Sequence, residues 1–323
     1  MKPAIRRRKT RPVFLGGVQI GGDAPVVVQS MTSTDTRDVE STVSQITDLV
    51  QAGCEVVRLA VPDEAAAAAI REIKDRIRIP LIADIHFHHR LALLAMDSGA
   101  DGIRINPGNI PADGIREVVR LARANKTVIR AGINAGSLER DVAARHGGPT
   151  APALVESALR TIRLLEELGF ESLKLSLKSS DVATTIEAYR LIAEKTDHPL
   201  HLGVTEAGTL VPAAIKSAIG IGTLLYDGIG DTIRVSVTGP PVQEIGVAYG
   251  ILRALNIRMV GPDIISCPTC GRCEIDLAGL TGRVETALTG MRHHLKIALM
   301  GCVVNGPGEA AEADIGIAGG KGS

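Results

Sequence analysis

The thiol groups of this sequence are concentrated near its C-terminal end. Cys267, Cys270 and Cys273 follow one another at gaps of two residues, and Cys302 and Glu309 come later in the same region. Closely spaced cysteines bind zinc or an iron–sulfur cluster in proteins that are not disulfide scaffolds. Four cysteines also suit a closed structural zinc site. The spacing therefore predicts a metal centre and leaves zinc and iron–sulfur both open.

A second group of reactive side chains is cationic and lies within or just after short apolar runs. These residues are Arg58, Arg104, Arg130, Lys174, Lys178 and Arg234. If the runs are parallel strands, their cations ring one mouth of the sheet, and guanidinium groups match phosphate oxygens in shape and charge. We therefore expect a substrate that carries phosphate. The alternative is that single cations pair with acids such as Asp84, Glu206 or Asp231.

One carboxylate and two glycine-containing turns complete the candidate site. Glu206 lies between small residues after an apolar run, where a carboxylate can act as a general acid or base. The alternative is a simple ion pair with Arg234 or Lys178. The turns at Asn106–Asn109 and Asn134–Ser137 offer backbone N–H groups to an anion.

These residues are spread over a stretch in which β-branched runs alternate with amphipathic segments. The eight runs are Val26–Ser30, Val56–Arg58, Leu81–Asp84, Gly102–Asn106, Val128–Arg130, Leu173–Ser176, Leu200–Val204 and Thr232–Ser236. Helices are expected between them, for example over Asp63–Ile77 and Leu154–Leu168, and a last one over Val242–Leu255. Eight such units predict an α/β fold of the (β/α)8 TIM-barrel type. A hairpin over Val13–Ile20, turning at Gly-Gly, is expected to close the bottom of the barrel.

The break at Gly261-Pro262 divides the chain. We expect residues 1–260 to form the substrate-binding barrel with its N-terminal hairpin, and residues 261–323 to form a small α+β metal domain. So short a segment has little room for an apolar core, and a bound metal centre would stabilise it.

Composition excludes several classes of protein. The 323 residues contain 36 Lys plus Arg and 36 Asp plus Glu, so the formal net charge is zero and no general attraction to nucleic acid or membrane follows. Aromatic residues make up only 2% of the chain, which argues against a binder that stacks nucleobases. The sequence has no apolar run long enough for a membrane span or signal core. We expect a cytoplasmic protein whose basic stretch Arg6–Arg11 is a solvated tail.

Seven motifs spread in order over both predicted domains resemble one enzyme family. They are Val28–Thr32, Ala83–Phe87, Arg104–Asn109, Gly132–Ser137, His201–Gly208, Cys267–Cys270 and Gly301–Glu309. The sequence resembles the bacterial 4-hydroxy-3-methylbut-2-en-1-yl diphosphate synthases of the non-mevalonate isoprenoid pathway. The resemblance implies a TIM barrel followed by a [4Fe–4S] domain, in a homodimer where the cluster domain of one chain caps the barrel of the other.

The resemblance also implies a reaction. The family opens 2-C-methyl-D-erythritol 2,4-cyclodiphosphate reductively to the linear hydroxy-methylbutenyl diphosphate, with two electrons from a flavodoxin or ferredoxin. By the family pattern, Cys267, Cys270 and Cys302 bind three irons, Glu309 binds the fourth, and Glu206 protonates the departing oxygen or an intermediate. The positions that match the family's diphosphate-binding residues are Arg58, Arg104, Arg130, Asn134, Lys178 and Ser236.

The sequence departs from the family pattern in two places. Cys273 is a further thiol that competes with Glu309 for the fourth iron if it faces the cluster, and we expect it to point away. Family members usually continue past Gly319-Gly320 with further strand and helix, so we expect the small domain to be truncated at its C-terminus.

Overall fold

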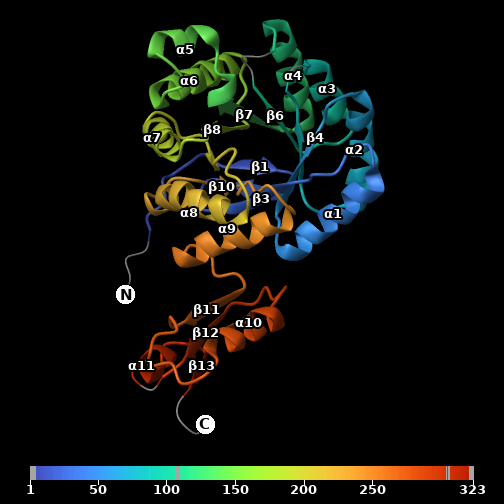
Figure 1. Cartoon of the computed structure of the whole chain (residues 1–323). Coiled ribbons are helices and arrows are strands. Elements are labelled where there is room, and N and C mark those ends of the chain that lie inside the picture. Colours follow the sequence, from blue (N-terminus) through green and yellow to red (C-terminus); the bar gives the residue numbers. More distant parts are fainter. Residues whose placement is uncertain (1–4, 87, 107–109, 303, 305, 320–323) are drawn as a thin grey trace. The chain divides into compact units, whose positions relative to one another are not determined.

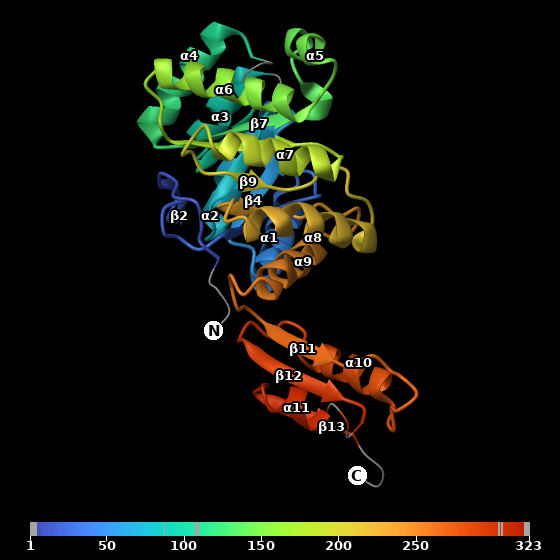
Figure 2. The same cartoon turned by 90° about the vertical axis from the view of Figure 1, so that its left-hand side faces the viewer.

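A computed structural model describes residues 5–86, 88–106, 110–302, 304 and 306–319, without the side chain of residue 307. The chain divides into two compact units between Ile257 and Arg258 (Figures 1 and 2). Among the described residues, no helix is both long enough and apolar enough to cross a membrane.

The first unit is a barrel of eight parallel strands. The strands are β3 (Val27–Met31), β4 (Val56–Ala60), β5 (Leu81–Asp84), β6 (Gly102–Ile105), β7 (Val128–Asn134), β8 (Leu173–Lys178), β9 (His201–Leu202) and β10 (Thr232–Ile233). They pair in the order β9–β10–β3–β4–β5–β6–β7–β8. A parallel bridge between Leu175 and Leu200 brings β8 back to the chain entering β9. The predicted TIM-barrel architecture is confirmed.

Helices follow the strands and cover the outside of the barrel (Figure 1). They are α1 (Val39–Ala52), α2 (Glu64–Arg76), α3 (His89–Asp97), α4 (Ala112–Asn125), α5 (Arg140–His146), α6 (Ala151–Glu167), α7 (Val182–Ala193), α8 (Leu210–Tyr226) and α9 (Val242–Ala254), with a 3-10 turn, η2 (Ala135–Ser137). Helix α2 shows why they form: Asp63 caps its first turn by accepting from Ala66 N–H at 2.9 Å, and Ile70 and Ile73 are buried on one face.

A hairpin closes one end of the barrel, as the sequence predicts. Strands β1 (Val13–Leu15) and β2 (Val18–Ile20) pair antiparallel, and Gly16 takes the left-handed conformation that the tight turn requires (φ 54°). Leu15 and Ile20 are fully buried and pack against apolar residues at the beginnings of the parallel strands, such as Val56. The hairpin therefore seals the N-terminal end and leaves the C-terminal end for a site.

The basic N-terminal run is pinned to the barrel, and the expectation of a solvated tail is wrong for three of its arginines. Arg7 Nη2 lies 3.1 Å from the buried carboxylate of Asp231. Arg8 donates to carbonyl groups at and after the end of α7. Arg11 Nη2 lies 2.6 Å from Asp197 Oδ1. These partners are distant in the sequence, so no local sequence pattern predicts the contacts.

The second unit is a small three-stranded sheet with helical connections. Its elements are β11 (Pro262–Ser266), α10 (Leu277–Ala287), β12 (Leu295–Met300), α11 (Gly306–Ala310) and β13 (Ile315–Ala318). The strands are parallel in the order β11–β12–β13. Leu277, Ile297 and Leu299 form its buried apolar cluster. The carboxyl ends of β11 and β12 therefore lie at one edge of the sheet.

Candidate functional site

The register of four neighbouring strands places charged residues side by side inside the barrel. Asp84 on β5 pairs with Arg104 on β6, Arg104 pairs with Arg130 on β7, and Arg130 pairs with Lys174 on β8. In-register residues of parallel strands point to the same face of the sheet. Four residues further along both strands, Asn134 on β7 pairs with Lys178 on β8. The sheet therefore stacks two polar layers toward its C-terminal end.

The lower layer lies deeper than the sequence predicts. Arg130 and Lys174 are each only 1% exposed, so they belong to the barrel interior and do not ring its mouth. The reason is that β7 and β8 extend further at their C-terminal ends than expected, so Lys174 lies four residues before the end of β8. Among the described residues, Nε and Nη1 of Arg130 and Nζ of Lys174 have no hydrogen-bond partner. Burial, together with the neighbouring arginines, lowers the pKa of both groups.

Asp84 is the acid at the centre of the cationic group. Its carboxylate lies 3.6 Å from Arg104 and 3.9 Å from Arg58, and His86 Nε2 lies 3.5 Å away. Burial opposes ionisation of Asp84, but Arg58, His86 and Arg104 outweigh it and hold its pKa well below the usual value. Asp84 thus pairs with two of the arginines that were expected to bind phosphate. This is the alternative in which single cations form ion pairs with acids such as Asp84.

The side chain of Arg104 lies close to the backbone of β7 at Gly132. A Cβ atom at Gly132 would lie 2.5 Å from Arg104 Nε, so only glycine fits there. With the amide of Asn134 oriented to satisfy both of its polar atoms, Oδ1 accepts from Arg104 Nη2 at 2.9 Å. The structure therefore brings Arg104 and Asn134 together. Of the turn predicted at Asn106–Asn109, only its first residue lies within the described part of the chain.

Lys178 lies in the upper layer and is 6% exposed. Its Nζ atom is 3.4 Å from Nε2 of His201, a fully buried residue on β9. Burial and the charges of Arg130, Arg58 and other arginines lower the pKa of Lys178. No ion pair to Lys178 occurs within the described residues, so the alternative pairing with Glu206 is absent from this structure.

Arg234 has a different acid partner from those the sequence suggested. Its Nη2 atom lies 2.9 Å from Oε1 of Glu244 on α9, and Glu244 also accepts from Ser30 Oγ at 2.8 Å. Ser236 follows two residues after Arg234 and is half-buried. The role of Glu244 could not be predicted from the sequence, because Glu244 lies in a helix and not at the end of a strand.

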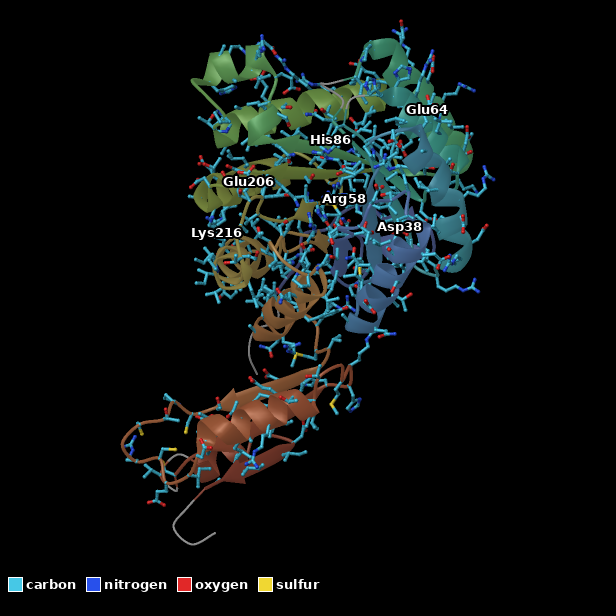
Figure 3. All side chains as sticks on the ribbon, turned by 45° about the vertical axis from the view of Figure 1, so that its right-hand side comes forward. Asp38, Arg58, Glu64, His86, Glu206 and Lys216 are labelled. Carbon is cyan, nitrogen blue, oxygen red and sulfur yellow. The ribbon has the colours of Figure 1, made fainter. Side chains whose placement is uncertain are left out.

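Glu206 follows β9 and is exposed (Figure 3). Its backbone lies in the left-handed region, with φ 53°. This conformation is uncommon for a residue with a side chain, and such strain occurs more often at functional sites. In the part of the chain that the structure describes, its carboxylate forms no hydrogen bond or ion pair. Glu206 is therefore available to a ligand at the C-terminal end of the barrel.

The cysteines of the second unit gather at the carboxyl edge of its sheet. Cys267 directly follows β11, and its Sγ accepts from Gly301 N–H at 3.3 Å, next to Cys302. Cys273 Sγ donates to the carbonyl oxygen of Ile275 at 3.3 Å and packs against the apolar cluster of this unit.

The other two candidate ligands of this unit are exposed. Cys270 lies in the loop after β11, where hydrogen bonding from the backbone of Arg272 lowers its pKa. Glu309 lies on α11, whose first residue, Gly306, packs against the last residues of β12 and β13. Over the described residues, no three His, Cys, Asp or Glu side chains are already arranged to hold a metal ion.

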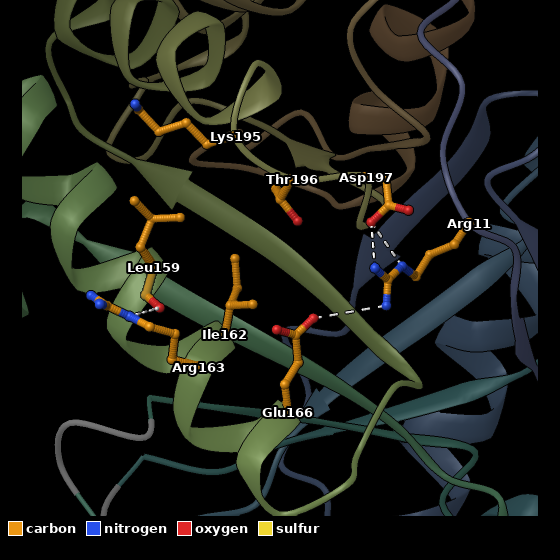
Figure 4. Close-up of a pocket in the computed structure, with 8 residues that line it drawn as sticks. All are labelled: Arg11, Leu159, Ile162, Arg163, Glu166, Lys195, Thr196 and Asp197. Carbon is orange, nitrogen blue, oxygen red and sulfur yellow. Dashed lines mark hydrogen bonds and ion pairs between the residues drawn. The ribbon is translucent and has the colours of Figure 1, made fainter.

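A separate cavity of about 410 Å³ lies near the sealed end of the barrel (Figure 4). It is lined by Arg11, by α6 residues such as Glu166, and by the segment that leads into β9. Arg11 bridges Asp197 and Glu166, at 2.6 and 3.8 Å. Segments that lead into strands lie opposite the end where barrel active sites form, so this cavity is not the candidate site.

Comparison with known families shows which proteins this chain is related to. Residues 10–249 match the GcpE TIM-barrel domain, and residues 263–323 match the GcpE protein C-terminal domain. The chain belongs to the GcpE family. The 4-hydroxy-3-methylbut-2-en-1-yl diphosphate synthase (flavodoxin) of Nitratidesulfovibrio vulgaris is 58% identical over 98% of this chain and 82% of that protein. The enzyme of the same name from Geobacter sulfurreducens is 57% identical over 98% of this chain and 90% of that protein.

Solved structures resemble the barrel of this GcpE protein. Dihydropteroate synthase from Stenotrophomonas maltophilia matches with a TM-score of 0.55 at 16% identity, over 76% of this chain and 98% of that one. Type I 3-dehydroquinate dehydratase from Clostridium difficile matches with a TM-score of 0.56 at 14% identity, over 76% and 98% of the two chains. At such low identity these matches show the fold alone.

Proposed function

We propose that this GcpE protein converts 2-C-methyl-D-erythritol 2,4-cyclodiphosphate to 4-hydroxy-3-methylbut-2-en-1-yl diphosphate by reductive ring opening and dehydroxylation. The observation that carries the proposal is a group of buried cations below the C-terminal end of the barrel, Arg130, Lys174 and Lys178, for which the described residues supply no ion pair. Burying unpaired charge is costly, and a diphosphate would supply the missing countercharge. The names of the curated relatives support the same reaction.

The diphosphate is held by residues of both polar layers and the loops above them. They are Arg58, Arg104, Arg130, Asn134, Lys178 and Ser236. Asp84 fixes Arg58 and Arg104 before the substrate arrives, which reduces the entropy lost on binding. Asn134 binds Arg104 and offers its amide from the adjacent strand.

Glu206 supplies the proton that the departing oxygen or an intermediate requires. Its support is its place after β9, its exposure and the absence of a competing cation within the described residues. A carboxylate that is not tied into an ion pair is free to exchange protons with a ligand.

The second unit holds a [4Fe–4S] cluster through Cys267, Cys270, Cys302 and Glu309. The donor set fits: β11 and β12 bring Cys267 beside the residue that precedes Cys302, and α11 starts from the same edge. When bound, the cluster delivers two electrons one at a time, received from a flavodoxin or ferredoxin. Glu309 is the ligand suited to yield its place, because a hard carboxylate holds iron less firmly than a thiolate does.

The enzyme acts in the cytoplasm as a homodimer in which the cluster unit of one chain caps the barrel of the other. Support for a second copy comes from α8, where Val211, Ile215, Ile219 and Tyr226 are all more than half exposed. Contiguous exposed apolar side chains on one face of a helix are typical of interfaces. A self-complementary patch suits a twofold dimer.

Iron, acid-labile sulfide and zinc, measured on protein purified without oxygen, test this function. We expect about four irons and four sulfides per chain, and turnover of the cyclodiphosphate that Glu206→Gln abolishes while metal and fold remain. Zinc without sulfide would contradict the proposal and favour a phosphate-handling lyase or synthase with a structural zinc tail.

A further inference from the structure

His201 and Lys178 form a hydrogen-bonded pair inside the barrel. The pair joins β9 to β8, with 3.4 Å between His201 Nε2 and Lys178 Nζ. On its other side, His201 Nδ1 lies 2.8 Å from the hydroxyl of Thr232, its register partner on β10. His201 is completely buried, so these two contacts use both of its ring nitrogens.

The direction of the two hydrogen bonds follows from the chemistry of the groups. Bound diphosphate favours the charged form of Lys178, and an ammonium group only donates. In that state Nε2 of His201 accepts from Lys178, and Nδ1 carries the ring hydrogen and donates to Thr232. Burial, with the charges of Lys178 and Arg130, lowers the pKa of His201 far below its usual value. The imidazole therefore stays neutral near pH 7, and its acceptor nitrogen persists.

The backbone around the pair is shaped to admit the ammonium group. A Cβ atom at Gly203 would lie 2.5 Å from Lys178 Nζ, so only glycine leaves the required space. Tyr189 ties the two strands together: its hydroxyl donates to the carbonyl of His201 and accepts from Leu177 N–H at 3.1 Å. Both partners are thus fixed by packing as well as by their own contact.

We propose that His201 is a positioning residue that holds the Lys178 ammonium in the orientation that binds the substrate diphosphate. It accepts one of the three ammonium hydrogens and leaves two for phosphoryl oxygens. Without this acceptor, the long side chain of Lys178 would be free to rotate, and binding would have to order it. The inference rests on the proposed function, because it takes the ligand above Lys178 to be a diphosphate.

Calorimetric titration of the full chain with inorganic diphosphate tests the inference. We expect His201→Leu, which keeps the volume but loses the acceptor, to weaken binding about tenfold or more, as for a lost hydrogen bond to a charged group. His201→Gln offers a carbonyl oxygen to Lys178 and should restore much of the affinity. The matched control is His198→Gln, another fully buried histidine, whose Nε2 contacts Glu166 at 3.2 Å. It should leave diphosphate binding unchanged.

A double-mutant cycle separates this inference from the proposed function. In a Lys178→Ala background, His201→Leu should cause no further loss, because its effect acts through Lys178. If Lys178→Ala alone leaves diphosphate affinity unchanged, the diphosphate site itself is wrong. If Lys178→Ala weakens binding but His201→Leu does not, only the positioning role is overturned.

Two readouts remain informative if His201→Leu fails to fold. Nitrogen-15 NMR of the wild-type chain with diphosphate bound should find His201 neutral with its hydrogen on Nδ1, and a hydrogen on Nε2 would contradict the inference. In the turnover assay, any loss that remains in His201→Gln should appear in KM more than in kcat, since Lys178 holds the diphosphate in the ground state and transition state alike. A loss confined to kcat would overturn the positioning role.

Discussion

The left-handed backbone of Glu206 predicts that one substitution will raise stability and abolish activity together. At φ 53°, the side chain of Glu206 crowds its own backbone, at a cost of about 1–2 kcal/mol. Glycine removes that strain but loses about 0.5–1 kcal/mol more conformational entropy on folding. Because the exposed carboxylate has no partner among the described residues, little else is lost. Glu206→Gly should therefore stabilise the barrel by about 0.5–1 kcal/mol.

Urea unfolding and thermal melting measure the stability change, which corresponds to a melting temperature raised by about 2 °C in a unit of this size. Turnover should disappear in Glu206→Gly and in Glu206→Gln, but only the glycine variant should gain stability. Lys126 is a matched control, because it has the same conformation (φ 57°) at the end of α4, away from the site. Lys126→Gly should gain similar stability and keep full activity.

Two results would refute this reasoning. A Glu206→Gly variant that keeps normal turnover would show that the carboxylate takes no part in the reaction. A variant less stable than the wild type would show that Glu206 makes a stabilising contact, and the backbone strain would then need another explanation.

Three further predictions concern the rest of the fold. Asp231→Ala should destabilise the chain by about 3 kcal/mol in urea unfolding, because Arg7 and Leu200 N–H lose the buried carboxylate that they contact. An unchanged urea midpoint would contradict the inference that the N-terminal run is held against the barrel. Burial raises the pKa of Cys54 to about 12, so at pH 8 iodoacetamide should leave Cys54 unmodified in the folded chain and alkylate it in urea, as read by peptide mass spectrometry. Ile215→Glu on α8 should turn the dimer into a monomer in analytical ultracentrifugation, whereas Phe14→Glu on the hairpin, which is equally exposed, should leave the dimer intact.

The strands of the barrel were predictable because buried parallel strands are short β-branched runs between turn residues. All eight runs fall on strands, and the hairpin at the sealed end was also visible from its Gly-Gly turn. Strand ends were less predictable. Hydrogen bonding with the neighbouring strand extends β8 to Lys178, whereas β9 has only two residues. Because β8 continues to Lys178, Lys174 lies in the interior of the barrel, below the mouth where it was expected.

The cations of the site and one acid partner, Asp84, could be found in the sequence, but most of their other contacts could not. Arg104 and Lys178 stand out as charges in apolar runs. The glycines that let them pass, Gly132 and Gly203, acquire meaning only when the neighbouring strand is in place. His201 reads as one more buried strand residue until the register sets it beside Thr232. Such contacts depend on strand order, which a linear pattern does not encode.

The most direct test of the central claim is a single-turnover experiment without oxygen. The chain, carrying its iron and sulfide, is mixed in excess over 2-C-methyl-D-erythritol 2,4-cyclodiphosphate together with a chemical reductant, because the reaction needs two electrons and one reduced cluster holds one. The products are separated by mass spectrometry. We expect 4-hydroxy-3-methylbut-2-en-1-yl diphosphate to form only when both the chain and the reductant are present. Unchanged cyclodiphosphate in the presence of a fully loaded, reduced chain would contradict the central claim.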